Sequence, residues 1–287
     1  MQSNKHLFLA ELRALSSELE ELRQEADRCG NFDPLEKKLG SVRQFVMNAE
    51  NASCWRRWEG DLELLHEATM LRDVLDRALC DLEKNHSRHL CQRPAEGTLP
   101  LEAYLDATYT EFRRSFRAEL AASGIGPKSR IVFIGAGALP VTALLFARES
   151  EAELLCHDID PEATRLAEKL VMHQGLAERI RCSCRPLESI PWVRQASHFI
   201  IASLVKEKAA VLRQLGSQMH GQAKIILRYG NGIKSLCNYP FDKEFSGSWH
   251  VTPLIYTGAV YDAVLLERHD GSEPGVVAAV DQKQGVP

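Results

Sequence analysis

The second half of the chain alternates short β-rich runs with stretches of helical periodicity, and this alternation constrains the fold more than any other feature. Seven β-rich runs occur, at residues 130–134, 153–157, 180–184, 198–202, 223–228, 252–256 and 260–267. Strands separated by helices predict a parallel sheet with right-handed crossovers. The last two runs have no helix between them, which predicts an antiparallel pair at one edge. We therefore expect an α/β domain built on a mostly parallel sheet.

The first part of the chain follows a different pattern. Up to about residue 120, apolar residues recur at helical spacing with charges between them, which predicts a bundle of four or five helices. Residues 123–127, SGIGP, stop the last helix. We predict a helical lid domain at 1–123, an α/β domain at 124–268 and a flexible tail at 269–287. Seven strands with a terminal hairpin are the elements of a Rossmann-type, class I methyltransferase-like domain, here preceded by an all-helical N-terminal domain.

Composition excludes several functional classes. The 287-residue chain is 45% hydrophobic and 26% charged, with a net charge of -4. No run approaches the roughly 18 uncharged apolar residues of a membrane span, and the first residues lack the pattern of a secretory signal. Lysine and arginine form no stripe interleaved with aromatic residues. We expect a cytoplasmic protein with neither a membrane nor a nucleic acid as partner.

The eight cysteines do not follow a metal-binding pattern. They are scattered along the chain, and the only close pair is Cys182 and Cys184. A zinc site needs Cys and His ligands at characteristic short spacings, which are missing. We expect reduced cysteines and no metal.

Residues 131–140, IVFIGAGALP, have the pattern of a buried strand, a glycine turn and a helix start. Gly135 permits the sharp turn, and Gly137 lets the main chain approach a ligand without an intervening Cβ. The helix start offers unpaired N–H groups, and Pro140 suits its first turn. We expect this loop to bind a nucleotide through Gly135, Ala136, Gly137, Leu139 and Pro140.

Two aspartates follow the next predicted strand, about twenty residues downstream of the glycines. Asp158 is placed to accept hydrogen bonds from both ribose hydroxyls, with Ile159 beside it. Asp160 either contacts the ligand or caps the helix that starts at Pro161, and both interpretations stay open. Pro140 replaces the third glycine of the dinucleotide fingerprint, which weakens the prediction of NAD and of a bound pyrophosphate. Dinucleotide and S-adenosylmethionine sites share this layout, so the fold alone leaves the ligand undecided.

An ordered series of motifs resembles those of nicotianamine synthases. The resemblance spans roughly residues 71–268 and includes 82–86 (LEKNH), 133–147 (FIGAGALPVTALLFA), 157–160 (HDID), 199–205 (FIIASLV), 226–232 (ILRYGNG) and 237–240 (CNYP). One motif departs from the family: its paired tyrosines are reduced to Tyr104, with Tyr109 as a substitute. The acceptor site should therefore differ from that of the plant enzymes.

A short chain with an altered acceptor site is similar to the bacterial branch that builds opine metallophores of the staphylopine and pseudopaline type. This resemblance implies transfer of the aminobutanoyl (3-amino-3-carboxypropyl) group of S-adenosylmethionine to the α-amine of an amino acid, with histidine as the expected acceptor. The other product would be 5′-methylthioadenosine, and an opine dehydrogenase would act downstream. Oligomeric state stays open, with a homodimer among the options.

The resemblance also implies roles for single residues. Glu83 is the expected base, and Tyr104 would hydrogen-bond the reacting amine or carboxylate. Arg228, at the end of a predicted strand, is placed to clamp the transferred carboxylate. The structural alternatives are a solvent-exposed position on a helix for Glu83, a core position for Tyr104 and a surface ion pair for Arg228. Other strand ends should line the pocket through Ala202, Ser203, Leu204 and Tyr229.

Two further functions remain possible from the sequence. One is an S-adenosylmethionine-dependent methyltransferase of a small molecule, which would release S-adenosylhomocysteine. The other is a non-enzymatic helical interaction module on a degenerate Rossmann domain. An NAD-dependent dehydrogenase ranks last, because the loop lacks its third glycine.

Overall fold

The N-terminal helices of the computed structural model form their own core. The structure describes residues 2–92, 110–241, 249–254 and 258–269. The first four helices are α1 (Gln2–Cys29), α2 (Asp33–Met47), α3 (Ala49–Arg57) and α4 (Leu62–Gln92). Buried leucines at helical spacing on α1 and α4, such as Leu12 and Leu71, share one apolar cluster. None of the described helices combines the length and apolarity that a membrane crossing requires.

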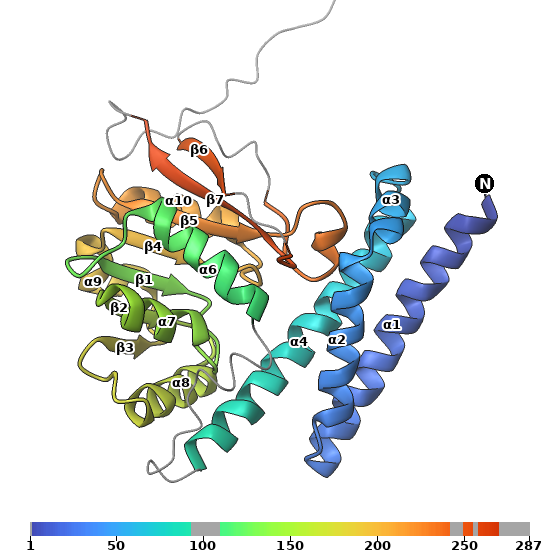
Figure 1. Cartoon of the computed structure of the whole chain (residues 1–287), viewed down its shortest axis with the longest axis horizontal. Helices are drawn as coiled ribbons and strands as arrows, with labels where there is room; N and C mark the ends of the chain where they lie inside the picture. Colours follow the sequence, from blue (N-terminus) through green and yellow to red (C-terminus); the bar gives the residue numbers. More distant parts are fainter. Residues whose placement is uncertain (1, 93–109, 242–248, 255–257, 270–287) are drawn as a thin grey trace, which may run out of the picture.

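A seven-stranded sheet forms the second part of the molecule (Figure 1). Its strands are β1 (Arg130–Ile134), β2 (Glu153–His157), β3 (Ile180–Ser183), β4 (His198–Ile201), β5 (Lys224–Tyr229), β6 (Trp249–Leu254) and β7 (Asp262–Arg268). The spatial order is β3-β2-β1-β4-β5-β7-β6, with β7 antiparallel to both of its neighbours. The predicted Rossmann-type fold is confirmed. β6 begins at Trp249, three residues before the predicted run.

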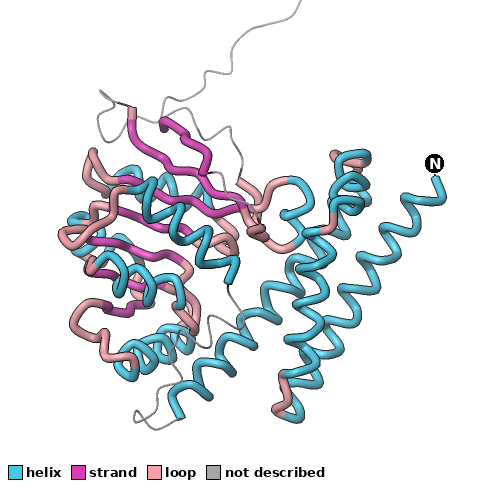
Figure 2. The backbone as a smooth tube through the Cα atoms, in the orientation of Figure 1, coloured by secondary structure: helices cyan, strands magenta, loops and turns pink. Residues whose placement is uncertain are grey.

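Helices cover both faces of the sheet (Figure 2). They are α6 (Thr110–Ser123), α7 (Val141–Ser150), α8 (Pro161–His173), α9 (Pro191–Gln195) and α10 (Lys208–Gln218). Successive residues of a strand point to opposite faces. Phe133 of β1 therefore packs with residues of α6, α7 and α8, whereas Val132 packs with residues of α9 and α10.

Helix α6 packs on the sheet. Phe116 is fully buried and makes an edge contact with Phe146 of α7 at a centroid distance of 4.7 Å. α6 lies on the N-terminal side of the predicted domain boundary at 123/124, which stays a prediction. Residues 270–287 of the predicted tail lie outside the described residues.

The two parts of the molecule meet along α4, which contacts α8 and the short helix η2 (Gly232–Leu236). Arg72 donates from Nη1 to the carbonyl of Ser235 at 2.6 Å. Nearer the C-terminal end of α4, Lys84 forms an ion pair with Asp160 at 2.6 Å. These contacts hold one face of α4 against the loops that follow the strands.

Candidate active site

The strand order reverses between β1 and β4, which creates a crevice at the carboxyl ends of these two strands. Gly135 directly follows β1, and Ala202 directly follows β4. The two loops touch, because Ala202 N–H donates to the carbonyl of Ile134 at 3.0 Å. Sequence motifs far apart in the chain thus meet at the position where open α/β sheets bind ligands.

Both glycines of the loop adopt left-handed backbone conformations, with φ of +75° at Gly135 and +69° at Gly137. A Cβ at Gly135 would lie 2.7 Å from a methyl group of Val205. A Cβ at Gly137 would overlap the carboxylate of Glu83. The sequence predicted that Gly137 makes room for a ligand; in this structure a protein carboxylate occupies that side.

Glu83 reaches the loop from α4, in the other half of the molecule. The N–H groups of Ala138 and Leu139, in the turn just before α7, interact with its carboxylate. Burial raises the pKa of Glu83 from its ordinary 4.5 to about 8, and the charge of Asp158 adds to the increase. The two N–H groups oppose this shift. A carboxyl group with a pKa near neutrality can accept and release protons under physiological conditions.

Other groups of the loop are engaged within the protein. The N–H groups of Gly135 and Ala136 donate to the carbonyl of His157, at 2.9 and 3.1 Å. Pro140 is the residue immediately before α7, and its carbonyl accepts from Leu144 N–H at 3.0 Å. The unpaired N–H groups that the sequence predicted for a ligand are therefore largely used by the loop itself and by Glu83.

Asp158 lies at the end of β2 and faces the glycine loop. Its Oδ2 accepts from Gly137 N–H at 2.8 Å, and its Oδ1 accepts from Asp160 N–H at 3.0 Å. Each carboxylate oxygen has a second lone pair, so ribose hydroxyls can still donate to it. Ile159, next in the chain, is 88% exposed.

Asp160 is the N-cap of α8, one of the two roles that the sequence allowed. Its side chain accepts from Glu162 N–H at 2.8 Å, and Pro161 occupies the first helical turn. Its second contact is the ion pair with Lys84. Asp160 therefore ties α8 to α4.

The loop after β4 contains Ala202, Ser203 and Leu204, all half-buried. The Ser203 carbonyl accepts from Tyr239 N–H at 3.1 Å and from Lys208 Nζ at 2.7 Å. Lys208 is buried, which lowers its pKa to about 7, and the charge of Arg72 acts in the same direction. Lys208 thus fixes the course of this loop from inside the protein.

Sequence reasoning missed a group of polar side chains between α4 and the loop that follows β5. The Tyr239 hydroxyl lies 3.0 Å from Asp73 Oδ1 and 3.3 Å from Asp76 Oδ2. The Arg72 guanidinium lies over the Tyr239 ring, 5.2 Å from its centroid. Burial raises the pKa of Asp76. The spacing of Asp76 and Glu83, two helical turns apart, was the available signal.

The predicted role of Arg228 as a carboxylate clamp is wrong for this structure. Its guanidinium is buried and donates to Glu119 through Nε at 2.9 Å and Nη2 at 2.5 Å, and Nη1 donates to Thr142 at 3.2 Å. Strand β5 turns this side chain into the core beneath α6, so a protein carboxylate takes the bidentate position. The alternative of a surface ion pair is also wrong, because both partners are buried.

Tyr229, the next residue, points to the opposite sheet face. It is 7% exposed and makes an edge contact with Phe241 at 5.8 Å. Its ring is part of the core on the α9 and α10 side, so the prediction that it lines the pocket is not supported. Tyr104 and Tyr109 lie outside the described residues.

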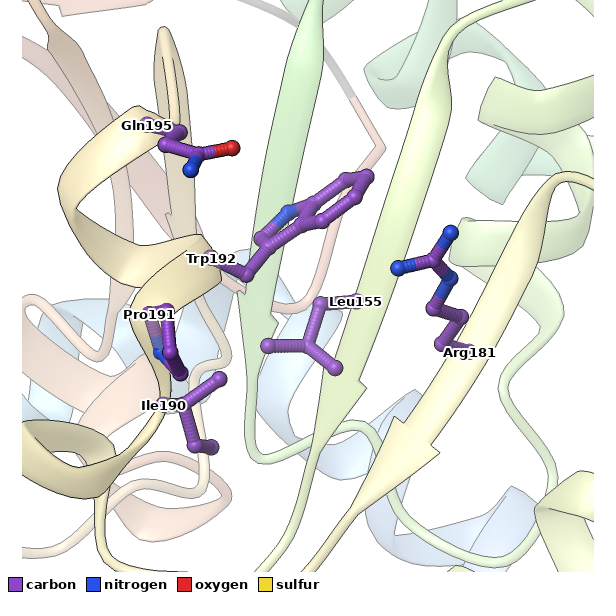
Figure 3. Close-up of a pocket in the computed structure, with 6 residues that line it drawn as sticks. All are labelled: Leu155, Arg181, Ile190, Pro191, Trp192 and Gln195. Atoms are coloured by element: carbon purple, nitrogen blue, oxygen red, sulfur yellow. The ribbon is translucent and has the colours of Figure 1, made fainter.

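A cavity of about 320 Å³ lies away from the glycine loop, between α9 and the strands β2 and β3. It is lined by Leu155, Arg181, Ile190, Pro191, Trp192 and Gln195 (Figure 3). Arg181 and Arg130 lie over the Trp192 ring at 4.9 and 5.3 Å. None of its lining residues belongs to the glycine loop, so this cavity is separate from the candidate site.

In the part of the chain that the structure describes, no group of three His, Cys, Asp or Glu residues is arranged to hold a metal ion.

Comparisons with known proteins agree on one family. The family model of nicotianamine synthase protein matches residues 71–272. An L-histidine 2-aminobutanoyltransferase of Pseudomonas aeruginosa is 37% identical over 262 residues, covering 91% of this chain and 97% of the relative. A protein of the same name from Yersinia pestis is 32% identical, covering 90% and 95%.

Solved structures share the fold over most of the chain. A structure of MtNAS in complex with MTA and tNA superposes with a TM-score of 0.75 at 16% identity, covering 91% of this chain and 97% of that one. A mutant of MtNAS in complex with S-adenosylmethionine gives a TM-score of 0.71 at 16% identity, with coverage of 91% and 98%. The family match over residues 71–272 and the 37% identity to a relative of nearly equal extent show that this chain belongs to the nicotianamine synthase family.

Proposed function

We propose that this chain transfers the aminobutanoyl group of S-adenosylmethionine to the α-amine of L-histidine and releases 5′-methylthioadenosine. The names of the relatives from Pseudomonas aeruginosa and Yersinia pestis support both the reaction and the L-histidine acceptor. The MtNAS structure with S-adenosylmethionine supports the donor.

The position of the Glu83 carboxylate is the observation that carries this proposal. The start of a helix attracts an anion, and in dinucleotide-binding proteins that anion is a pyrophosphate. Here the Glu83 carboxylate interacts with the N–H groups of Ala138 and Leu139, in the turn just before α7. A phosphate group would raise the pKa of Glu83 still further, whereas the cationic sulfonium of S-adenosylmethionine would stabilise its ionised form. The site therefore favours a nucleoside that carries positive charge.

Glu83 also supplies the base that the reaction needs. A protonated α-amine is not a nucleophile, so a proton must leave before the amine attacks. The amine nitrogen then bonds to the γ-carbon of the donor, the bond from this carbon to sulfur breaks, and its electron pair stays on the thioether of methylthioadenosine. Glu83 accepts the amine proton. A sulfonium carries three electrophilic carbons, so alignment with the nucleophile decides which one reacts.

The remaining groups of the site would hold the nucleoside. Asp158 is our proposed ribose ligand, because its oxygens face the loop and retain acceptor capacity. The loop at Ala202, Ser203 and Leu204 would line the adenosine pocket beside Gly135. Tyr104 remains a proposed partner of the reacting amine.

The biological setting is a further part of the proposal. The aminobutanoyl-histidine product retains a primary amine that an opine dehydrogenase can join to an α-keto acid by reductive condensation. Such a product has carboxylates, amines and an imidazole that chelate transition metals. We therefore propose a cytoplasmic role in the biosynthesis of an opine metallophore.

Product analysis tests the reaction directly. We expect the purified protein, incubated with S-adenosylmethionine and L-histidine, to form methylthioadenosine and a histidine adduct in equal amounts by mass spectrometry. S-adenosylhomocysteine with a methylated product would instead establish a methyltransferase. Parallel incubations with D-histidine and other amino acids would establish the acceptor, and no product from any of them would refute an enzymatic role.

Substitution of Gly137 by alanine tests whether the loop must accommodate Glu83. The methyl group would displace this carboxylate from the N–H groups of Ala138 and Leu139. We expect turnover to fall by at least about tenfold, since misplaced catalytic groups are inefficient. Gly175→Ala is the matched control, because Gly175 has φ of +68° with open space around its Cβ position. Both variants carry the backbone strain, so equal turnover in the two would contradict the role of this contact.

A further inference from the structure

The face of α4 that presents Glu83 to the glycine loop carries a second carboxylate, that of Asp76. The two residues are separated by two helical turns, or about 10.5 Å along the axis at 1.5 Å per residue. Cys80 lies between them and is exposed. Its thiol lies 4.0 Å from Asp76 Oδ1. Asp76 and Glu83 therefore lie on the same side of this helix.

Asp76 has hydrogen-bonding capacity that the protein does not fill. The Tyr239 hydroxyl has one proton to donate, and it is shared between Asp73 at 3.0 Å and Asp76 at 3.3 Å. Asp73 has an additional cation, Lys206, at 3.9 Å. Over the described ranges, no lysine or arginine nitrogen lies within ion-pair distance of Asp76, whose other oxygen has only the Cys80 thiol at 4.0 Å.

The surroundings of Asp76 favour a donor that carries positive charge. Burial raises the pKa of this carboxyl group, and the neighbouring Asp73 charge raises it further. The Tyr239 hydroxyl and the charges of Lys206 and Arg77 only partly offset the increase. A ligand N–H group that binds here would stabilise the ionised carboxylate, and a protonated ring would do so most strongly.

The spacing of Asp76 and Glu83 along the helix is of the same order as the length of the proposed acceptor. The α-nitrogen and the far ring nitrogen of an extended histidine are about 6 Å apart, and a hydrogen bond of about 2.8 Å at each end gives a span of about 11–12 Å. This span is comparable to the roughly 10.5 Å between the backbone positions of Asp76 and Glu83 along α4. A histidine whose amine approaches Glu83 can therefore extend its imidazole toward Asp76.

We propose that Asp76, oriented by Tyr239, binds the far ring nitrogen (Nε2) of the histidine acceptor and thereby selects histidine over other amino acids. This inference rests on the proposed transferase function. Asp76 acts on acceptor binding, whereas Glu83 acts on the chemical step. A purely structural role for Asp76 would be to anchor Tyr239, and asparagine would preserve it, because its amide oxygen also accepts from a hydroxyl.

Steady-state kinetics of Asp76→Asn distinguish these roles. We expect KM for histidine to rise about 10- to 100-fold, the loss of one charge-assisted hydrogen bond, with kcat changed by less than about threefold. The affinity for methylthioadenosine, measured by calorimetry, should not change. Asp81→Asn is the matched control, because Asp81 is on the same helix but pairs with Arg23 of α1 at 3.0 Å.

Acceptor analogues give a second test that needs no variant. With the wild-type protein, histidine methylated at the far ring nitrogen should show a raised KM, whereas methylation at the near ring nitrogen should have a smaller effect. The opposite order, or an unchanged KM in Asp76→Asn, overturns the assignment of Asp76 and leaves the transferase function intact. A wild-type protein that forms no methylthioadenosine with histidine overturns both.

Discussion

Replacing Glu83 by glutamine is expected to lower turnover by about 10²–10⁴, the contribution of a general base, with binding of the uncharged nucleoside methylthioadenosine retained. The glutamine side chain is nearly isosteric, and its amide oxygen can still interact with the N–H groups of Ala138 and Leu139 just before α7. It cannot take a proton from the acceptor amine. Turnover should be measured by methylthioadenosine release and binding by calorimetry. Glu63→Gln is the matched control, since Glu63 is on α4 but pairs at the surface with Arg13 at 2.9 Å. Unchanged turnover would remove Glu83 from the mechanism.

The pKa of Glu83 gives this prediction a pH signature. For the free enzyme, kcat/KM should rise with pH through an apparent pKa near 8, because only the ionised carboxylate is a base. Stability should show the opposite trend. The pKa is about 8 in the folded state and 4.5 ordinarily, so the folded protein binds more protons between these values and loses stability as pH rises through them.

A glutamine at position 83 does not ionise, so it removes this loss of stability at high pH. At pH 9, the unfolding free energy of Glu83→Gln should therefore exceed that of wild type by up to about 5 kcal/mol, and the variant should unfold at a higher temperature. Below about pH 4.5 this difference should disappear. Such a gain would be the expected trade between stability and function at an active site. Thermal denaturation at the two pH values measures it.

Breaking the buried ion pair of Arg228 and Glu119 should destabilise the fold by about 3–5 kcal/mol. Arg228→Met leaves the Glu119 carboxylate without its bidentate partner in a buried position, where Glu119 has no exposed side-chain surface. Urea unfolding should show the loss as a lower midpoint. Arg13→Met is the matched control, because Arg13 is 51% exposed and such surface pairs contribute less than about 1 kcal/mol.

A double substitution separates charge burial from packing. Arg228→Met combined with Glu119→Leu removes both charges, so most of the lost stability should return. The hydroxyls of Thr142 and Tyr261, at 3.2 and 3.4 Å from the pair, would lose partners and limit the recovery. Equal stability of the double and single variants would contradict this account.

The sequence predicted the sheet well because its signals are local. Each parallel strand is a short apolar run next to a turn. Gly135 and Gly137, both with positive φ, lie where the turn after β1 requires them. The N-cap of Asp160 depends only on its neighbours Pro161 and Glu162, so it could be foreseen as one of two roles.

The contacts that could not be predicted join residues far apart in the chain. Glu119 lies 109 residues before Arg228, and nothing near either residue indicates the pair. Gly137 and Glu83 were each singled out, but the contact between them depends on how α4 docks across the sheet loops. The role of Asp76 was missed for the same reason, because its hydroxyl partner Tyr239 is 163 residues away.

The carboxylate at the glycine turn belongs to a helix outside the nucleotide fold. A shortened chain that began after α4 would keep Gly135, Gly137 and Asp158, yet it would lack the proposed base Glu83, and the amide groups before α7 would be hydrated. Conversely, the isolated helices would hold a glutamate with an ordinary acidity. The raised pKa of this proposed base thus arises where α4 meets the sheet loops, and the closeness of that packing sets how far the acidity of Glu83 is shifted.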